Sequence, residues 1–408
     1  MPRALIDEID IPVRYQHPDL KKRRAVLRDT VDKLATDNAR LAYHKKAADN
    51  HLRWASAARL PQEVRVIRGD WGDVTQALSK ENGQMYAVLN MANAYSPGGG
   101  YLQGMSAQEE NMFRRTDCHF YVADDEMNVA KSSYTKEQTD LINGEHGAVY
   151  FDRQDPRVCI KGSEGSGVSG YHDFDDNDYF LFYELKSAAD DLREGKPFNE
   201  ESMRKKIAAQ LDTLRTHGVR FVVLSAFGCG AFKNPPLLVA KLYREELNKR
   251  LGDFDDVVFA VHHAGYGTDN YPAFYDELNG LPLSTIRADF KAAALKELLR
   301  AMQGNVNNKV WDERGFAYPF FDVRKTPKGI TQMRDILNST MDDFTKLHQL
   351  KDLAKYRLLH PPLFTKRDDH VRDLYQAILQ LNINEIDDII IDSFKLDDAP
   401  TMAPSLEL

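Results

Sequence analysis

The chain has 408 residues, a hydrophobic content of 42%, an aromatic content of 10% and a formal net charge of −8 at pH 7. These values are typical of a globular protein with two or three domains. The negative charge argues against general nucleic-acid binding, which depends on Lys and Arg neutralising phosphates. A single pocket for a phosphorylated ligand needs only backbone amides. No apolar run approaches the roughly 20 residues of a membrane span, so no membrane association is expected.

The cysteines and the first residues of the chain predict the cellular compartment in which the protein works. Cys118, Cys159 and Cys229 cannot form a closed set of disulfides, and none lies in a CxxC pair. The first residues also lack the pattern of a secretory signal. We therefore expect a cytoplasmic protein, or a nuclear or host-cell protein if it is eukaryotic or a secreted effector.

The pattern of elements changes along the chain. Residues 20–60 are charged and lack Gly and Pro, which predicts helices, and their early basic cluster is expected to be a solvated face. From about residue 62, short apolar runs predict buried strands. These runs are "EVRVIRGD", "QMYAVLN" and residues 219–228 and 256–265.

Helices are predicted between the later strands. Apolar residues recur at helical spacing over 203–214, and Gly218 is expected to end that helix. A second apolar stripe covers 239–247, with Asn234 as the expected N-cap and Pro235 in the first helical position. Strands that alternate with helices imply a mostly parallel sheet covered on both faces.

After residue 285 the strand pattern largely ends. In "GITQMRDILNSTMDDFTKLHQLKDLAKYRLL" a helical stripe predicts a packing face formed by Ile330, Met333, Leu337, Met341 and Phe344. The segment "NEIDDIIIDSF" is ambiguous between strand and helix. We expect an N-terminal helical extension at 1–60, an α/β domain at 61–284 and a helical accessory region at 285–408.

A triple glycine follows the predicted strand "YAVLN". The strand ends at Asn90, and Gly98, Gly99 and Gly100 come after a short loop. Ligands of open α/β sheets bind at the carboxyl ends of strands, and glycines there let backbone amides approach a phosphate. The contiguous glycines differ from the dinucleotide fingerprint GxGxxG, and a simple turn is an equal alternative.

The segment "SAQEE" that follows has a structural interpretation. Ser106 at the N-cap and Glu109 three residues later would form a capping box. This box does not explain Gln108 or Glu110, although the helix dipole also favours an acidic residue at that place.

A second glycine loop, "LSAFGCGAFKNPP", follows the predicted strand at 219–227, and its Gly228 and Gly230 precede the next predicted helix. Such a loop is a natural anion site, and two of them suit a ligand with two linked phosphates. Cys229 is interpreted as a small residue that fills the loop rather than as a nucleophile. Of His262 and His263, one is expected to point into the core and the other toward solvent or the cleft. No third ligand at metal spacing accompanies them.

These segments resemble a known family. "GGGYLQGMSAQEE" is similar to the signature of the poly(ADP-ribose) glycohydrolases, a triple glycine followed by Gln-Glu-Glu. "VLNMANAYSPGGG" and "LSAFGCGAFKNPP" resemble the preceding strand and loop and the second phosphate loop of the microbial type. The resemblance covers roughly residues 60–280 and extends weakly into the N-terminal helices. It implies a macrodomain-like three-layer α/β/α sandwich with a mixed, mostly parallel sheet, to which N-terminal helices and a helical C-terminal region are added.

The resemblance also implies roles for particular residues. Glu110 corresponds to the catalytic glutamate, and Glu109 to the neighbour that positions the ribose next to the scissile bond. The implied substrate-binding residues are Asn90, Asn93, Gly98, Gly99, Gly100, Gln108, Gly228, Cys229, Gly230, Ala231, Phe232 and Asp73, with Asp70 competing with Asp73 for the adenine. No cofactor or metal is implied.

The chemistry suits one glutamate. It can protonate the leaving oxygen of a ribose–ribose bond and then activate water. A raised pKa is expected for a carboxyl in a dry cleft beside a second one. The expected activity is hydrolysis of poly(ADP-ribose), with ADP-ribose as product. The alternatives are removal of one ADP-ribose from a modified protein, recognised through residues 285–408, and a non-catalytic ADP-ribose reader, against which the complete Gln-Glu-Glu argues.

Overall fold

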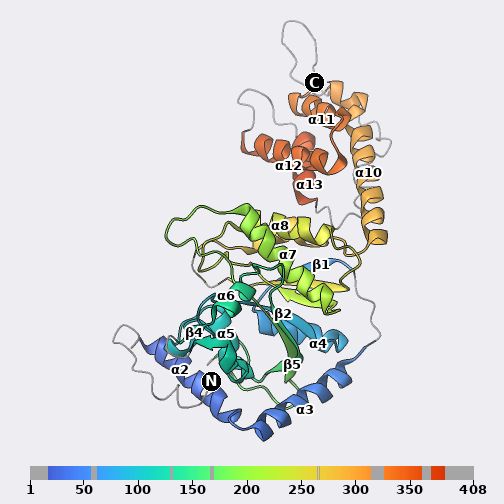
Figure 1. Cartoon of the computed structure of the whole chain (residues 1–408). Coiled ribbons are helices and arrows are strands. Elements are labelled where there is room, and N and C mark those ends of the chain that lie inside the picture. The colour runs from blue at the N-terminus through green and yellow to red at the C-terminus, as the bar shows by residue number, and fades with distance from the viewer. Residues whose placement is uncertain are drawn as a thin grey trace. The chain divides into compact units, whose positions relative to one another are not determined.

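The computed structural model describes residues 17–56, 62–128, 132–165, 170–263, 265, 267–313, 326–360 and 369–381 (Figure 1). The chain divides into two compact units, Met1–Thr285 and Ile286–Leu408. Among the described residues, three buried apolar clusters lie in the first unit and one lies in the second.

A six-stranded sheet lies at the centre of the first unit. The strand order is β1 (Val64–Arg68), β8 (Asp256–Val261), β7 (Phe221–Leu224), β2 (Tyr86–Met91), β6 (Phe180–Ser187) and β5 (Tyr150–Cys159). All neighbouring pairs are parallel except β5 and β6, which are antiparallel. The expected mixed, mostly parallel sheet is therefore confirmed.

Two strands of this sheet were not predicted from the sequence. In β6 the apolar pattern is interrupted by Glu184 and Lys186, both of which are buried. In β5 the pairing register shifts between Asp152 and Arg157, where the segment is charged and contains Pro156. Buried charges and a bulge both remove the continuous apolar run by which a central strand is recognised.

Helices cover both faces of the sheet (Figure 1). The helices of the first unit are α2 (Pro18–Lys33), α3 (Asp37–Trp54), α4 (Trp71–Asn82), α5 (Gln108–Arg115), α6 (Lys136–Ile142), α7 (Glu200–Thr216), α8 (Pro236–Asn248) and α9 (Tyr271–Leu278). Short elements complete it: η2 (Tyr101–Gln103), η3 (Asp117–Tyr121), η4 (Asp124–Glu126), β3 (Met127–Asn128) and β4 (Ser133–Tyr134).

Two apolar clusters show how the layers are held together. One cluster joins α7, α8 and α9 to one face of the sheet, and the other joins α2, α3, α4 and α5 to the opposite face. Within β2, Ala87 and Leu89 belong to the first cluster, whereas Tyr86 and Val88 belong to the second. This alternation is the period of two that a strand imposes on its side chains. The expected three-layer α/β/α sandwich is confirmed.

The helix ends agree with the sequence only in part. α7 ends before Gly218, which has a φ of +64°, as predicted. The cap predicted for α8 is wrong, because Pro235 is the N-cap and Pro236 takes the first helical position. Asn234 instead lies outside the helix and is buried.

The helices of the second unit are α10 (Thr285–Asn307), whose first residue is the last of the first unit, η6 (Lys309–Glu313), α11 (Lys328–Asn338), α12 (Asp343–Leu359) and α13 (Asp369–Gln380). The predicted single stripe is divided between two helices. Ile330, Met333 and Leu337 are buried on α11, whereas Phe344 is exposed on α12. The helix is interrupted because Asp342 caps α12 by accepting a hydrogen bond from the Thr345 amide. The ambiguous segment at 384–394 lies outside the described residues.

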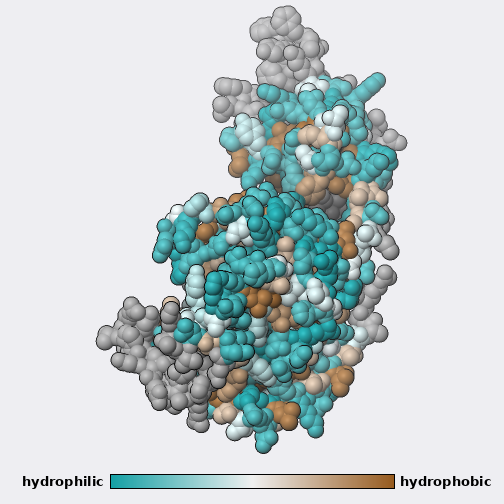
Figure 2. Space-filling model, in the orientation of Figure 1, coloured by the Kyte–Doolittle hydropathy of each residue, from teal (hydrophilic) through white to brown (hydrophobic). Residues whose placement is uncertain are grey.

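Hydrophilic side chains cover most of the visible face of the first unit in Figure 2. Within the described ranges, no helix is long and apolar enough to cross a membrane.

Candidate active site

The two predicted glycine loops follow neighbouring strands. β2 and β7 are paired in parallel, with Ala87 opposite Val222. Their carboxyl ends therefore open at the same edge of the sheet. The loop after β2 contains Gly98–Gly100, and the loop after β7 contains Gly228 and Gly230. The sheet order thus brings together two segments that are far apart in the sequence.

The triple glycine is required by both conformation and space. Gly98 and Gly99 have φ values of +68° and +56°, which favour glycine. A Cβ on Gly99 would lie 2.6 Å from Glu110 Oε1, and one on Gly98 would lie 2.6 Å from the Tyr101 ring. The loop therefore packs directly against the glutamates of α5.

Both glutamates are buried and accept hydrogen bonds from this loop. Glu109 is 3% exposed, and its Oε2 and Oε1 accept from the amides of Asn93 at 2.7 Å and Gly98 at 3.0 Å. Glu110 is 8% exposed, and its Oε1 accepts from the Gly100 amide at 2.9 Å. The two carboxyls hold the glycine loop in place by three backbone contacts.

The predicted capping box is wrong. The N-cap of α5 is Ala107, with no side-chain hydrogen bond to the helix, and Ser106 is exposed. The Glu109 carboxyl turns inward to the glycine loop rather than back to the helix start. An unpaired N–H group costs more free energy when it is buried than when it is exposed to solvent. The Glu109 carboxyl therefore stabilises the protein more by accepting from two amides of the buried loop than by capping the solvated start of the helix.

The polar residues around the glutamates form hydrogen bonds with other groups of the protein. Gln108 accepts from the Met91 amide at 3.0 Å and donates to the Leu89 carbonyl at 2.9 Å, which fixes α5 to the end of β2. Asn93 accepts from the amides of residues 95 and 96, both at 2.9 Å. Asn90 is fully buried and donates to Glu184 at 2.8 Å. Gln108 and Asn93 thus shape the loop, while Asn90 faces the interior.

The second loop has a similar construction. Gly228 has a φ of +72°, and a Cβ there would lie 2.5 Å from that of Ala189. Asn234 donates to the carbonyls of Gly228 at 3.0 Å and Asp190 at 2.8 Å, so it fastens this loop to the segment after β6. Cys229 is buried, and burial raises the pKa of its thiol, which disfavours a nucleophilic thiolate.

The end of the second loop lies at the surface. Gly230 and Ala231 are exposed. Phe232 is half-buried, and the Arg193 guanidinium lies 5.2 Å from its ring centre. A half-exposed ring can offer one face to a ligand.

Arg115 of α5 connects the two candidate adenine contacts. It is fully buried, forms an ion pair with Asp70 and contacts Asp73 at 3.1 Å. Asp70 also caps α4 through the Gly72 amide at 2.8 Å. Asp73 accepts from Ser163 at 2.6 Å. Because the Asp73 side chain is 45% exposed and that of Asp70 is 14% exposed, Asp73 is the more accessible of the two.

The two histidines at the end of β8 do not divide between core and cleft as expected. His262 and His263 are both exposed, because β8 ends at Val261. Among the described side chains, no group of three or more His, Cys, Asp or Glu residues could hold a metal ion.

The environment of Glu109 changes its ionisation. Burial and the adjacent Glu110 carboxyl raise the pKa of Glu109 well above its ordinary value. The Asn93 amide and the Lys186 ammonium act in the opposite direction.

Sequence reasoning missed several residues that build this site. Arg114 donates to the Met105 carbonyl at 2.6 Å and is fully buried, like Arg115. Tyr95 and Met105 are large, exposed hydrophobic residues on the glycine-loop segment. Arg on a short helix is ordinarily exposed, so no sequence pattern predicted that these arginines would be buried. The one available indication was their place about one turn after Glu110.

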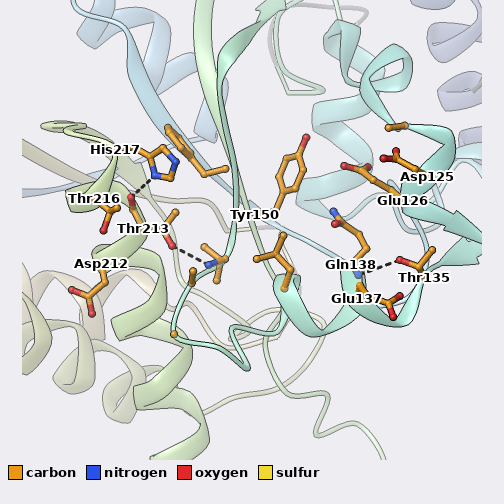
Figure 3. Close-up of a pocket in the computed structure, with 16 residues that line it drawn as sticks. Asp125, Glu126, Thr135, Glu137, Gln138, Tyr150, Asp212, Thr213, Thr216 and His217 are labelled. Carbon is orange, nitrogen blue, oxygen red and sulfur yellow. Dashed lines mark hydrogen bonds between the residues drawn. The ribbon is translucent and has the colours of Figure 1, made fainter.

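One hollow in the described part of the chain lies away from these residues. It has a volume of about 760 Å³, and its lining includes none of the predicted site residues. Figure 3 shows Asp212, Thr213 and His217 on one side, Glu126 and Gln138 on the other, and Tyr150 between them. The glycine loops supply backbone amides and the two buried glutamates supply carboxyl groups. We therefore assign the candidate active site to these segments rather than to the hollow.

Comparisons with known proteins agree with the sequence motifs. Residues 10–150 match the family model of the microbial-type PARG, catalytic domain, where PARG denotes poly(ADP-ribose) glycohydrolase. The comparison with curated proteins gave no match.

Solved structures with the same enzyme name are also similar to this chain. One is the glycohydrolase of Thermomonospora curvata bound to the inhibitor ADP-HPD, at 22% identity and a TM-score of 0.41, covering 62% of this chain and 98% of that one. Another is the enzyme of Deinococcus radiodurans in complex with ADP-ribose, at 20% identity and a TM-score of 0.41, covering 57% of this chain and 90% of that one.

The matched segment includes the triple glycine and both glutamates but ends before the second glycine loop. Residues 10–150 therefore resemble the catalytic domain of microbial-type poly(ADP-ribose) glycohydrolases, which confirms the resemblance drawn from the glycine and Gln-Glu-Glu motifs.

Proposed function

We propose that this protein is a poly(ADP-ribose) glycohydrolase whose macrodomain-like first unit releases ADP-ribose from the polymer. One observation carries the proposal. Two buried, adjacent glutamates are held by the amides of a triple-glycine loop, beside a second glycine loop on the neighbouring parallel strand. The family match over residues 10–150 supports it.

In the proposed reaction, Glu110 is the general acid and base. Its proton passes to the leaving oxygen as the bond from that oxygen to the ribose carbon breaks, and the bonding electrons stay with the oxygen. Water then attacks the cationic ribose and returns a proton to Glu110. Because Gly100 contacts Oε1, the other oxygen of Glu110 is the one assigned to the substrate.

The glycine loops supply the binding that such a substrate needs. The diphosphate would lie between the loop at Gly98–Gly100 and the loop at 228–232, where backbone amides provide attraction despite the net charge of −8. Phe232 would pack on the terminal ribose, and Asp73 would contact the adenine. Glu109, tied to two amides, would position the neighbouring ribose.

The decisive experiment replaces Glu110. Release of ADP-ribose from purified polymer should fall about 10³-fold in Glu110→Ala and Glu110→Gln, as is typical for loss of a general acid. Binding of free ADP-ribose, measured by calorimetry, should persist. Glu137→Ala on α6 is the control, because that glutamate lies outside both glycine loops. A fully active Glu110→Ala enzyme would show that the catalytic assignment is wrong.

A second candidate is removal of a single ADP-ribose from a modified protein by the same glutamate. The observation that favours it is the separate helical unit, Ile286–Leu408, which lies beyond the family match and has its own apolar core. We propose that this unit selects the modified protein. Polymer and serine-, arginine- and carboxylate-linked ADP-ribose should be offered side by side. Preferential turnover of one protein linkage would favour the second candidate, and binding without turnover would indicate a reader.

A further inference from the structure

The hollow of Figure 3 lies between η4, α6, the start of β5 and the last turn of α7. Its volume of about 760 Å³ is in the range of sites that bind small molecules. The glycine loops and the two glutamates of α5 do not line it. A ligand in this hollow would therefore occupy a site of its own.

Two polar side chains of the hollow have a buried atom without a partner. Gln138 of α6 is 7% exposed, and its Nε2 has no hydrogen-bond partner in the described structure. Glu126 of η4 is half-buried, and its Oε2 is also unpaired among the described residues. Figure 3 shows both side chains on the same side of the hollow, beside Tyr150. An unpaired buried polar group is costly to the fold, so a ligand that pairs both atoms would explain them.

The surrounding structure holds these two residues in place. The Gln138 amide donates to Thr135 Oγ1 at 3.2 Å, and the Thr135 amide donates to the Glu126 carbonyl at 2.8 Å. The Lys186 ammonium lies over the Tyr150 ring, 4.3 Å from its centre. Burial raises the pKa of Glu126, as expected of a carboxylate that has lost contact with water. The walls of the hollow are therefore formed without a ligand.

The charges around the hollow restrict the class of ligand. Its acidic lining residues are Asp125, Glu126, Glu137 and Asp212, and no Lys or Arg is among the described residues that line it. Such a lining repels phosphates, so ADP-ribose does not suit this site. Asp212 already forms ion pairs with Arg250 at 2.7 Å and Arg215 at 3.0 Å. Glu126, with its unpaired buried oxygen, is therefore the carboxyl best suited to contact a ligand.

The two unpaired atoms require a donor and an acceptor side by side. An ammonium or guanidinium group would pair with Glu126 but not with the Gln138 nitrogen, and a carboxylate would pair with Gln138 but be repelled by Glu126. A carboxamide carries an N–H beside a C=O and can pair with both. The apolar lining, which includes Leu141, Tyr150 and Phe151, suits an aromatic ring. We propose that this hollow binds a small aromatic carboxamide, whose N–H donates to Glu126 Oε2 and whose C=O accepts from Gln138 Nε2.

Three compounds with the same ring test the chemistry of the site. Benzamide has both a donor and an acceptor, benzamidine is a cation with donors only, and benzoate is an anion with acceptors only. In calorimetry with the full chain, benzamide should bind with a Kd of about 1 mM or below. It should bind about 10-fold more tightly than the other two, because each of them leaves one buried group unpaired.

Three results of this titration would overturn the inference. Absence of saturable benzamide binding is the first. Tighter binding of benzamidine than of benzamide is the second, because it would show that the hollow takes cations. Displacement of benzamide by saturating ADP-ribose is the third, because it would place benzamide at the glycine loops.

Variants of the two residues test the contacts. Gln138→Leu removes the donor with little change in volume, and Glu126→Ala removes the acceptor. Each should weaken benzamide binding about 10-fold or more. The melting temperature of Gln138→Leu should stay the same or rise, because an unpaired buried group is lost. A purely structural glutamine would instead lower the melting temperature and leave benzamide binding unchanged, which would contradict the inference.

Asp140→Asn is the matched control. Asp140 lies on the same helix as Gln138 and forms an ion pair with Lys136, but it does not line the hollow. This variant should bind benzamide as the natural protein does. Should Gln138→Leu fail to fold, Glu126→Ala decides, because the contact of Glu126 with Thr135 uses the backbone carbonyl. Undiminished affinity in a folded Glu126→Ala would overturn the inference.

The result does not depend on the proposed function, because benzamide binding is measured without polymer. A protein that binds benzamide but releases no ADP-ribose would refute the glycohydrolase alone. A protein that releases ADP-ribose but does not bind benzamide would refute the inference about the hollow alone.

Discussion

The position of Gly99 imposes two structural requirements that no other residue type can meet together. Its φ of +56° is in the left-handed region, and its missing side chain leaves room for the Glu110 carboxyl. Many glycines satisfy only the first condition. Gly147, for example, has a φ of +75° with no atom within 4 Å of an added Cβ. Substitutions of Gly99 and Gly147 can therefore distinguish the effect of backbone strain from the effect of displacing the Glu110 carboxyl.

We expect Gly99→Ala to reduce ADP-ribose release about 100-fold, because it displaces Glu110 from its place. Gly147→Ala should share the backbone cost of about 1 kcal/mol in the free energy of unfolding but keep full activity. Chemical denaturation and a polymer assay measure the two effects. Equal activity in both variants would show that the loop does not position Glu110.

Glu109 predicts a pH dependence of stability. Burial and Glu110 raise the pKa of Glu109 above its ordinary value of 4.5, so the folded protein holds this proton more tightly than the unfolded chain does. The contribution of Glu109 to the free energy of unfolding is therefore complete below about pH 4.5 and decreases as the pH rises through the folded-state pKa.

Glu109→Gln removes this titration. The difference in melting temperature, natural protein minus variant, should decrease as the pH rises from 4.5. The variant also loses one acceptor for the loop amides, but that loss is the same at every pH. Calorimetry from pH 4 to pH 8 makes the comparison, and a constant difference across that range would contradict the expected ionisation.

At the scale of elements, the loop between β7 and α8 depends on a residue that sequence reasoning misassigned. Asn234 has the residue type and place of an N-cap, yet its amide donates to two carbonyls of the loop and of the segment after β6. Asn199 is a true cap, because it accepts from the Ser202 amide at 3.0 Å at the start of α7. The two asparagines form a matched pair of variants.

Asn234→Ala should lower the free energy of unfolding by about 2 kcal/mol, because two partly buried hydrogen bonds to backbone carbonyls are lost. It should also weaken ADP-ribose binding, since the second glycine loop is no longer fastened. Asn199→Ala should cost about 1 kcal/mol, as a lost helix cap does, with unchanged binding. Urea denaturation and calorimetry measure both quantities. Undiminished affinity in Asn234→Ala would argue against ligand contact at this loop.

The elements also show what local patterns can and cannot predict. The apolar runs at β1, β2, β7 and β8 and the helical stripes at α7 and α8 were predicted correctly, because burial on both faces leaves a continuous apolar signal. β6 was missed because Glu184 and Lys186 are paired or compensated only in three dimensions.

At the scale of the whole molecule, the two units have separate apolar cores. Leu283 packs in the core of the first unit, and its amide donates to the Gln62 carbonyl at 2.8 Å. The second core begins at Leu295. A boundary near residue 285 therefore leaves both cores complete.

A fragment of residues 1–285 should fold cooperatively and release ADP-ribose from polymer with a kcat within about twofold of that of the full chain, because its core is undivided. If the second unit selects a modified protein, turnover of that protein alone should fall. Circular dichroism and the two assays compare fragment and full chain. Failure of the fragment to fold would show that the units are not independent.

Local sequence patterns predict the alternation of strands and helices and the two glycine loops, and the resemblance of the Gln-Glu-Glu motif to a known family points to Glu109 and Glu110 as candidate catalytic residues. These features are local, since apolar periodicity, glycine at a turn and a short motif are all properties of adjacent residues. Three features depend on the folded chain: Glu109 contacts the glycine loop instead of a helix cap, Asn234 fastens the second loop, and Lys186 is buried opposite Asn90. Local patterns cannot predict them because burial and hydrogen-bond partners depend on which strands become neighbours, and β2, β6 and β7 are brought together across more than a hundred residues of sequence.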